Sequence, residues 1–416
     1  MLNFFGRKNL LAFLILVAVI VVLIVVVKQR VGDLRPALLP PTKDITNLAE
    51  KQAVGEPVDF PLKLPDGLQI GLFAKNLGAA RDLEFTNDGT LLVSVPAKGQ
   101  VLALADENDD GVADENKVIL QGLLRPHGLA FFGNKLFVAE ETRVVRYNWN
   151  SENKTATQDK VLFSLPEGGR HFTRTIAFDK TGRMFVSVGS TCDVCFEKHP
   201  FFAAVLVSDA QGNNPKLFAK GLRNAVFITI NPATDELWGT EMGRDFLGDN
   251  LPPDEINIIA EGNPSTASGP RDYGWPLCYG NRVHDTNFDK KVYIQIVPQP
   301  PCGETETPVY EIPAHSAPLG LTFVNSPQFP KEWQGDLLVS YHGSWNRSTP
   351  TGYKVVRLDV EGNSVKEESD FITGFLGPAT GPGGALGRPV DLIFDETGGL
   401  YISDDKAGVI YKLIKK

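Results

Sequence analysis

The stretch TIAFDKTGRMFVSVG, from Thr175 to Gly189, decides the fold because its pattern returns five more times along the chain. It is a short apolar strand, a polar turn that contains Gly, and a second apolar strand, which is the pattern of a β-hairpin. The other copies are DLEFTNDGTLLVS (Asp82–Ser94), GLAFFGNKLFVAE (Gly128–Glu140), FITINPATDELWGTE (Phe227–Glu241), GLTFVNSPQFPKEWQGDLLVSY (Gly320–Tyr341) and DLIFDETGGLYISD (Asp391–Asp404). Recurrence of one unit over the body of a chain indicates a repeat architecture.

The spacing of the copies predicts an all-β fold, a single six-bladed β-propeller. The apolar residues that end the first strands are Phe85, Phe131, Phe178, Ile230, Phe323 and Phe394. Their first three intervals, of 46, 47 and 52 residues, match a four-stranded blade, while the last two, of 93 and 71 residues, indicate insertions. The last apolar strand, GVIYKLI, ends two residues before the C-terminus, so we expect LQIGLFAKNL (Leu68–Leu77) to close the ring. A β-sandwich with coincidental repetition is the alternative.

The composition excludes some classes of protein. The 416 residues are 42% hydrophobic and 22% charged, as in a soluble globular domain, and 40 Gly and 29 Pro suit a fold rich in turns. The formal charge of −9 argues against a nucleic-acid partner, because binding to a phosphate backbone needs clustered basic residues. The GxSxG motif of serine hydrolases and the HExxH motif of zinc proteases are absent from the sequence.

The N-terminus is a separate element. After residues 1–9, Leu10–Val27 is an unbroken apolar run that is long enough to span a bilayer as a helix. No small-residue cleavage pattern follows it, so we expect an uncleaved membrane anchor rather than a removed signal peptide. Basic residues flank the run on both sides and leave its orientation open. Residues 28–60 are expected to form a linker, and residues 61–416 a propeller that lies outside the cytoplasm.

Four cysteines lie in the body of the chain. Their even number, downstream of an export-like segment, favours disulfides over metal ligation. Cys192 and Cys195 have CxxC spacing, but Phe196 stands where haem attachment needs His, and the βαβ setting of a thioredoxin-like site is missing. We expect a local Cys192–Cys195 disulfide, and a Cys278–Cys302 pair would close a long loop.

Polar residues directly before the six first strands are candidates for a site. Because the inner strand of each blade begins near the central channel, we expect these residues to meet around the propeller axis. They are Arg81 and Asp82, Arg125 and His127, Arg170, His171 and Arg174, Arg223 and Asn224, His315, and Arg388. Such a cationic pocket suits a polyanionic cofactor, and His171 is placed to act as a general base.

Several motifs resemble those of one known family. They are GGRHFTRTIAFDKTGRMFVSVGSTCDVC, KGLRNAVFITINP, RDFLGDNLPPDEINII, DYGWPLCYG, AHSAPLGLTF, HGSWNRS and GRPVDLIFDETGGLYISDDKAG. In this order, between about Leu64 and Leu413, they resemble the glucose/sorbosone dehydrogenase family, and most of all its L-sorbosone dehydrogenase-like branch. The resemblance implies a propeller enzyme that depends on pyrroloquinoline quinone (PQQ) and calcium. Its substrate would be a sugar or related aldose, and its electron acceptor is not identified.

The resemblance also implies roles for individual residues. His171 matches the base that takes the substrate hydroxyl proton while hydride passes to the quinone. Arg223 and Asn224 match the pair that contacts the quinone oxygens and stabilises the reduced cofactor, and the backbone carbonyls of Gly243 and Arg244 match two calcium ligands. Further residues expected to contact the cofactor are Asp254, Tyr273, Arg388 and Asp405. His127 is also expected to contact it, because it lies directly before the first strand of the second hairpin copy.

Some residues depart from the family pattern. In its soluble glucose dehydrogenases, Gln occupies the position of Met242, and a carboxylate precedes the base where this chain has Arg170. A Lys follows the strand that here continues as Tyr341-His342-Gly343. These changes leave a cofactor site in place but argue against glucose itself as the substrate. The segment HGSWNRS is expected to reshape the substrate side.

A second calcium candidate is the acidic stretch DENDDGVADE, Asp106–Glu115. Its oxygen-bearing residues follow the alternating spacing of an EF-hand loop: Asp106, Asn108, Asp110, the Val112 carbonyl and Asp114. Lys117 stands where an EF-hand has its bidentate Glu, which excludes a full EF-hand. A solvated acidic turn is the alternative.

Two other functions stay open on the sequence alone. A calcium-dependent propeller lactonase would need Glu, Asn and Asp side chains around the axis, where this chain has Arg and His. A non-catalytic propeller that binds carbohydrate or protein would have no need for His171, Arg223 and Asn224 together. A propeller fold by itself decides none of these.

Overall fold

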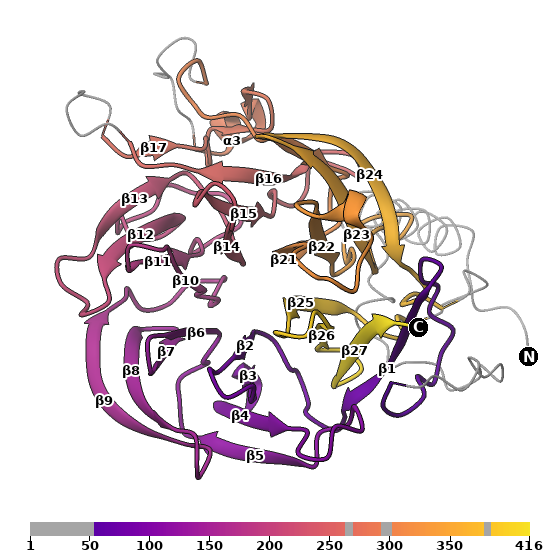
Figure 1. The fold of residues 1–416 in the computed structure, drawn as a ribbon. Helices are drawn as coiled ribbons and strands as arrows, with labels where there is room; N and C mark the ends of the chain where they lie inside the picture. Colours follow the sequence, from indigo (N-terminus) through magenta and orange to yellow (C-terminus); the bar gives the residue numbers. More distant parts are fainter. Residues whose placement is uncertain (1–53, 263–268, 293–301, 378–383) are drawn as a thin grey trace, which may run out of the picture.

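The chain forms a ring of six β-sheets around a central axis, which confirms the predicted six-bladed propeller (Figure 1). The computed structural model describes residues 54–262, 269–292, 302–377 and 384–416. In each sheet a short strand lies nearest the axis, and the strands that follow it in the sequence lie progressively further out. Each copy of the repeated pattern supplies the two innermost strands of one blade.

The first three blades come from the first half of the chain. Blade 1 contains β2 (Leu83–Phe85), β3 (Leu91–Val95), β4 (Gln100–Ala105) and β5 (Glu115–Leu120), with the short helix η1 (Pro96–Lys98) between β3 and β4. Blade 2 contains β6 (Gly128–Phe132), β7 (Lys135–Glu140), β8 (Arg143–Asn150) and β9 (Thr155–Ser164). Blade 3 contains β10 (Ile176–Phe178), β11 (Arg183–Val188), β12 (Ala204–Asp209) and β13 (Lys216–Lys220).

Blades 4 and 5 carry the insertions. Blade 4 contains β14 (Ile228–Ile230), β15 (Leu237–Glu241), β16 (Asp254–Ile259) and β20 (Tyr310–Ile312). Blade 5 contains β21 (Pro318–Phe323), β22 (Leu337–Tyr341), β23 (Lys354–Glu361) and β24 (Ser364–Ile372), with η2 (Lys331–Trp333) before β22. The insertion between β16 and β20 holds β17 (Arg271–Asp272), β18 (Cys278–Tyr279), β19 (Val283–His284) and α3 (Thr286–Val292), and β17 joins blade 3 by parallel pairing with β13.

Blade 6 joins the two ends of the described chain. It contains β25 (Pro389–Phe394), β26 (Leu400–Asp404), β27 (Val409–Lys415) and β1 (Leu68–Ala74). β1 pairs antiparallel with β27, with Ile70 opposite Leu413, and Figure 1 shows indigo β1 beside yellow β27. The predicted closure of the ring by an N-terminal strand is therefore confirmed.

The hydrophobic core consists of separate clusters that lie between neighbouring blades. A cluster of buried apolar side chains lies between each pair of neighbouring blades, because each sheet buries both faces against the next. The second strands β3 and β22 are buried at every position, whereas the outer strand β5 is largely exposed. The starts of the inner strands are thus fixed by packing on both sides.

Both expected disulfides are present, Cys192–Cys195 and Cys278–Cys302. Within the described residues, no helix is long and apolar enough to cross a bilayer. The predicted membrane span, residues 10–27, lies outside the described residues, as do residues 1–9 and most of the expected linker.

Candidate functional site

A cavity of about 250 Å³ lies among the segments that precede the inner strands of blades 3, 4 and 5. Its wall is formed by Arg170, His171, Arg223, Asn224, Met242, Gly243, Asp245, Asp254, His315, Ala317, Trp345 and Asn346. The structure thus brings together His171, Arg223 and Asn224, which precede the third and fourth copies of the hairpin in the sequence. Gly243 and Asp254 join the same wall.

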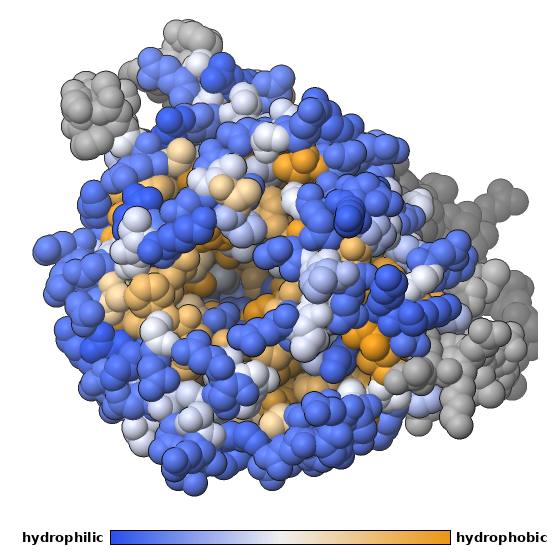
Figure 2. Space-filling view, in the orientation of Figure 1, coloured by the Kyte–Doolittle hydropathy of each residue, from blue (hydrophilic) through white to orange (hydrophobic). Residues whose placement is uncertain are grey.

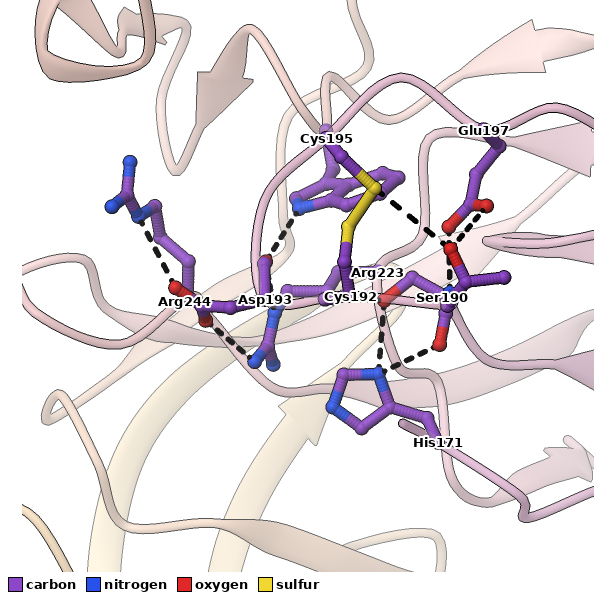
Figure 3. The surroundings of a disulfide bond; sticks show 10 residues. His171, Ser190, Cys192, Asp193, Cys195, Glu197, Arg223 and Arg244 are labelled. Atoms are coloured by element: carbon purple, nitrogen blue, oxygen red, sulfur yellow. Dashed lines mark hydrogen bonds and ion pairs between the residues drawn. A yellow bond between two sulfur atoms is a disulfide. The ribbon is translucent and has the colours of Figure 1, made fainter. Parts of the chain in front are cut away.

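The imidazole of His171 is held in one tautomer. Its Nδ1 lies 3.1 Å from the carbonyl oxygen of Ser190 and 2.9 Å from the Ser190 hydroxyl. Because a carbonyl oxygen only accepts, Nδ1 carries the hydrogen and Nε2 keeps its lone pair, on the ring edge away from Ser190 (Figure 3). Burial, followed by the charges of Arg223 and Arg170, lowers the pKa of His171 from 6.5 to about 3. The residue is therefore neutral near pH 7 and able to accept a proton at Nε2.

Arg223 and Asn224 lie beside this base. The Arg223 side chain is only 4% exposed, and its guanidinium donates to the Met242 carbonyl at 3.1 Å and to the Asp193 carboxylate at 2.9 Å. The Asn224 Oδ1 atom is buried and has no hydrogen-bond partner among the described residues. An unpaired buried oxygen costs about 1–3 kcal/mol, so this position suits a ligand that offers a hydroxyl donor or a cation.

A glycine allows this close arrangement. A Cβ atom built on Gly189 would lie 2.6 Å from the Cβ of His171 and 2.8 Å from the Oδ1 of Asn224. Any other residue at this position would push the base and the amide apart. The glycine at the end of the third hairpin copy is therefore part of the site.

Asp254, on β16, organises the loop that carries the predicted calcium ligands. Its Oδ1 accepts from the Gly243 N–H and its Oδ2 from the Ala317 N–H, both at 2.9 Å. Burial raises the pKa of Asp254 to about 7. The Arg244 side chain turns to Asp285, with Nη1 2.7 Å from Oδ2. Asp254 thus fixes the peptide of Gly243, and calcium binding by the Gly243 and Arg244 carbonyls stays a prediction.

Arg388 and Asp405 lie in a separate cluster with Arg81 and His342. The Asp405 carboxylate contacts His342 Nε2 and Arg81 Nη1, both at 2.8 Å, and Arg388 Nε donates to the His342 carbonyl at 2.9 Å. Although burial raises the pKa of Asp405, His342, Arg81 and Arg388 together hold it well below its usual value. These residues come from blades 1, 5 and 6, whereas the cavity at His171 lies between blades 3, 4 and 5.

His127 and Tyr273 do not reach the cavity. His127 is fully buried, with Nδ1 3.3 Å from the Arg174 carbonyl and its ring packed near Phe227. The Tyr273 hydroxyl donates to the Ile258 carbonyl at 2.7 Å and accepts from a backbone N–H. The Nε2 atom of His127 is buried without a hydrogen-bond partner among the described residues, and Tyr273 lines a smaller pocket with Arg223, Gly243 and Arg244. The cofactor contacts of both residues stay predictions.

The loop at Asp106–Glu115 is closed by its own side chains. The Asp106 carboxylate accepts from the N–H groups of Asp110 and Gly111, and Asp110 Oδ1 accepts from the Val112 N–H. Asn108 donates to Asp114 at 3.2 Å. These hydrogen bonds order the turn, and metal binding at Asp106, Asn108, Asp110, Val112 and Asp114 stays a prediction.

Sequence reasoning missed some residues of the site. Asp193 and Asp245 both form ion pairs with Arg223. Asp193 lies inside the CxxC ring and Asp245 directly follows Arg244, and neither position in the sequence indicates a contact with Arg223. Trp345 and Asn346 line the cavity. They belong to HGSWNRS, the segment expected to reshape the substrate side. This tryptophan-asparagine pair is the feature of the sequence that could have identified them as site residues.

Comparison with known proteins identifies relatives over nearly the whole propeller. The family model described as TrAA12-like matches residues 62–416. An uncharacterized protein of Borreliella burgdorferi is 30% identical over 378 residues, which cover 86% of this chain and 92% of that protein. The pyrroloquinoline quinone-dependent pyranose dehydrogenase of Coprinopsis cinerea is 24% identical over 417 aligned residues, 86% of this chain but only 55% of the enzyme.

Solved structures share the fold. The holo form of the pyranose dehydrogenase PQQ domain from Coprinopsis cinerea has a TM-score of 0.71 at 22% identity, over 87% of this chain and 100% of that one. The iodide structure of a Trichoderma reesei enzyme of carbohydrate-active family AA12 has a TM-score of 0.72 at 21% identity, over 89% and 100%. With a family model matched from residue 62 to the C-terminal residue, the chain belongs to the TrAA12-like family.

Proposed function

We propose that this protein is a PQQ- and calcium-dependent oxidoreductase that oxidises a sugar or related aldose. The observation that carries the proposal is the wall of one cavity, where a neutral His171 lies beside Arg223 and Asn224. The Coprinopsis relative is named as a PQQ-dependent pyranose dehydrogenase, which supports this cofactor and substrate class. The nearer resemblance to the L-sorbosone branch stays a prediction.

His171 is the proposed base. Ser190 keeps the hydrogen on Nδ1, so Nε2 is free to take the proton of a substrate hydroxyl. The low pKa means that the imidazole holds this proton weakly and passes it on to solvent readily. Arg170, whose side chain is 44% exposed, lies at the same wall and orients substrate oxygens in this proposal.

Arg223 and Asn224 are the proposed cofactor contacts. When bound, PQQ supplies the two-electron oxidation by accepting hydride from the sugar carbon, with calcium as a Lewis acid at its quinone. The positive charge of Arg223 suits an anionic cofactor, and the unpaired Asn224 oxygen suits a hydroxyl donor or the metal. The Gly243 and Arg244 carbonyls, with the loop held by Asp254, are the oxygen ligands proposed for calcium.

A sugar panel tests the reaction. The purified protein is loaded with PQQ and calcium, and reduction of an artificial electron acceptor is followed with neutral aldoses, ketoses and sugar aldehydes. We expect reduction that requires both PQQ and calcium and that falls to background when either is left out. If the protein binds PQQ but reduces no acceptor with any of these sugars, the proposed activity is wrong. A lactone panel in the same buffer tests for hydrolysis, the competing chemistry.

We further propose that residues 10–27 anchor the protein in a membrane with the propeller outside the cytoplasm. The length of the apolar run supports an anchor, and two disulfides suit an oxidising compartment. Carbonate extraction of membranes is expected to leave the protein in the pellet, and protease added on the non-cytoplasmic side of the membrane is expected to digest the propeller. Release of the intact propeller into the carbonate supernatant would contradict the anchor.

A further inference from the structure

The ring closed by the Cys192–Cys195 disulfide contacts Arg223 directly and is linked to His171 through Ser190 (Figure 3). It belongs to the segment between β11 and β12, which starts right after Gly189. The ring contains Asp193 and Val194, and the Val194 side chain is buried. Two residues of this small ring make polar contacts toward the cavity wall, one toward Arg223 and one toward His171.

Asp193 is the main partner of Arg223. Its carbonyl accepts from Arg223 Nε at 2.8 Å, and its Oδ1 accepts from Arg223 Nη2 at 2.9 Å. The same Oδ1 accepts from the Asp245 N–H at 2.8 Å, and the carbonyl also accepts from the indole of Trp275 at 3.2 Å. With side chains that are 4% and 11% exposed, this is a buried ion pair with two-point geometry, which fixes the guanidinium plane.

Cys192 supports the base from the other end of the ring. The Ser190 hydroxyl donates to the Cys192 carbonyl at 2.7 Å, which turns its oxygen toward His171 Nδ1 at 2.9 Å. The Ser190 N–H in turn donates to the Arg223 carbonyl at 2.7 Å. The orientation of the imidazole and that of the guanidinium are therefore both tied to carbonyls of adjacent ring residues.

We propose that the disulfide-closed ring is a clamp that sets the positions of His171 and Arg223, with Asp193 as the positioning residue. Closure of a ring of four residues leaves its carbonyls few directions, whereas an open CxxC segment samples many. This inference rests on the proposed function, because it names what holds the base and the cofactor contact in place. An open ring weakens PQQ binding and releases the His171 tautomer without unfolding the propeller.

The clamp is open to a small dithiol. Cys192 and Cys195 are half-buried, whereas Cys278 and Cys302 are 5% and 3% exposed. A dithiol such as dithiothreitol attacks one ring sulfur as its thiolate; the S–S bond breaks, both cysteines become thiols, and the reagent leaves as a cyclic disulfide. The partly exposed bond is reached first, so mild reduction opens the clamp and leaves Cys278–Cys302 closed.

The test compares two disulfide deletions in the full chain. PQQ is titrated with calcium into the wild type, the Cys192→Ser/Cys195→Ser variant and the matched Cys278→Ser/Cys302→Ser variant. We expect the first variant to raise the Kd for PQQ at least tenfold and to become insensitive to dithiothreitol, and the second to keep a Kd near that of the wild type. Circular dichroism and the melting temperature check that both variants are folded. Equal affinity of the first variant and the wild type would overturn the clamp.

A graded pair of substitutions tests Asp193 itself. Asp193→Asn keeps an Oδ1 acceptor in place, while Asp193→Ala removes it, so a positioning role predicts a larger rise in Kd for Ala than for Asn. Equal effects of the two variants would contradict positioning by this oxygen. Since neither variant touches a cysteine, the series also decides the matter if the Cys192→Ser/Cys195→Ser variant fails to fold.

A readout without cofactor separates this inference from the proposed function. The imidazole ¹⁵N spectrum of the apoprotein reports which nitrogen of His171 carries the hydrogen. We expect the Nδ1–H form in the oxidised wild type and a mixture of tautomers after mild reduction. If the wild type binds no PQQ, the proposed function fails while this spectrum still tests the clamp. An unchanged His171 spectrum in a protein whose Cys192 and Cys195 are shown to be reduced would overturn the clamp alone.

Discussion

His171 lies between a hydrogen-bonding partner on one side and cations on the other. Ser190 holds the hydrogen on Nδ1, and burial together with Arg223 and Arg170 disfavours a second proton. Both influences act in the same direction, toward an imidazole with a free Nε2. The imidazole is therefore neutral before a substrate arrives, with Nε2 as its proton-accepting atom.

Substitution of His171 separates binding from turnover. In His171→Ala we expect turnover to fall by roughly 10²–10⁴-fold, the usual contribution of a general base, with little change in the Kd for PQQ. Steady-state kinetics and a PQQ titration measure the two quantities. His199→Ala, which removes an exposed imidazole outside the cavity wall, is the matched control and should retain full turnover. Wild-type turnover in His171→Ala would remove this residue from the mechanism.

The pH profile follows from the lowered pKa of His171. The base is active when neutral, so kcat/KM should stay level as pH falls through 6.5, the ordinary value, and decline only toward about pH 3. Because Arg170 is one of the charges that lower this pKa, Arg170→Gln should move the acidic limb to higher pH. An acidic limb near pH 6.5 that Asp254→Asn also shows would mean that His171 is solvated or not the base, because the Asp254 carboxyl, with a pKa of about 7, titrates in the same range.

The sequence predicted some of these residues and not others, for a physical reason. His171, Arg223 and Asn224 precede inner strands, and strand packing alone delivers that position to the axis. Asp193 acts only because a disulfide turns its carbonyl and carboxylate toward a side chain 30 positions further along the chain. Contacts of that kind depend on tertiary geometry and leave no periodic trace in the sequence.

At the scale of the elements, β1 is the strand on which the ring depends. It pairs with β27 over almost its whole length and sends Ile70 into the apolar cluster between blades 5 and 6. Its closing role was predictable because the last blade lacks an outer strand of its own in the sequence. The bounds also agree, since the expected Leu68–Leu77 contains the observed Leu68–Ala74.

Loss of packing on β1 should destabilise the whole propeller. Ile70 is fully buried, so we expect Ile70→Ala to reduce the free energy of unfolding by roughly 2–5 kcal/mol. Gln69→Ala, one position away and on the opposite face of the strand, should have a much smaller effect. Denaturant unfolding of both variants makes the comparison. If both substitutions reduce the free energy of unfolding by the same amount, β1 does not hold the ring through its buried face.

The presence of an insertion in blade 4 was predictable, but its bounds and its structure were not. Its Pro- and Gly-rich sequence carries no strand period, yet β17 pairs in parallel with β13 of the preceding blade. That pairing depends on which sheet edge the loop happens to pass. The Cys278–Cys302 disulfide within the insertion was expected because its cysteines were the remaining pair.

At the scale of the whole molecule, the inner strands of all six blades line a central channel with a cavity of about 300 Å³. Figure 2 shows the molecule hollowed around the axis. Carboxylates on the inner strands link neighbouring blades there: Asp391 accepts from the Leu83 N–H and Asp82 from the Leu129 N–H, both at 2.8 Å. The inner strands have no further strand on the axial side, so side chains satisfy their free N–H groups.

One of these carboxyls makes stability depend on pH. Glu84, whose Oε1 accepts from the Phe131 N–H at 2.8 Å, has its pKa raised by burial from 4.5 to about 8. A raised pKa favours the neutral folded form, so this stabilisation is present below pH 4.5 and is lost as pH rises through about 8. Glu84→Gln should therefore melt higher than the wild type at pH 8 and close to it at pH 5. Equal melting temperatures at pH 8 would show that Glu84 titrates normally.

The architecture itself was the most predictable feature, since six copies of one hairpin leave few alternatives. The grouping of charges around the axis was less so. Their position before each inner strand predicts one common pocket, but the structure places some at the cavity at His171, others in the cluster at Asp405, and Arg125 beside Glu141. Which neighbours a charged side chain joins depends on local pairing, which the repeat does not encode.

The cavity lined by His171, Arg223 and Asn224 is the proposed binding site of PQQ. The most direct measurement is a calorimetric titration of PQQ into the oxidised apoprotein, with calcium and with a chelator, for the wild type and Arg223→Leu. We expect saturable binding of one PQQ per chain, weakened by the chelator and weakened at least tenfold in Arg223→Leu. Absence of saturable binding in the folded wild type with calcium, or equal affinity of the two proteins, would contradict it.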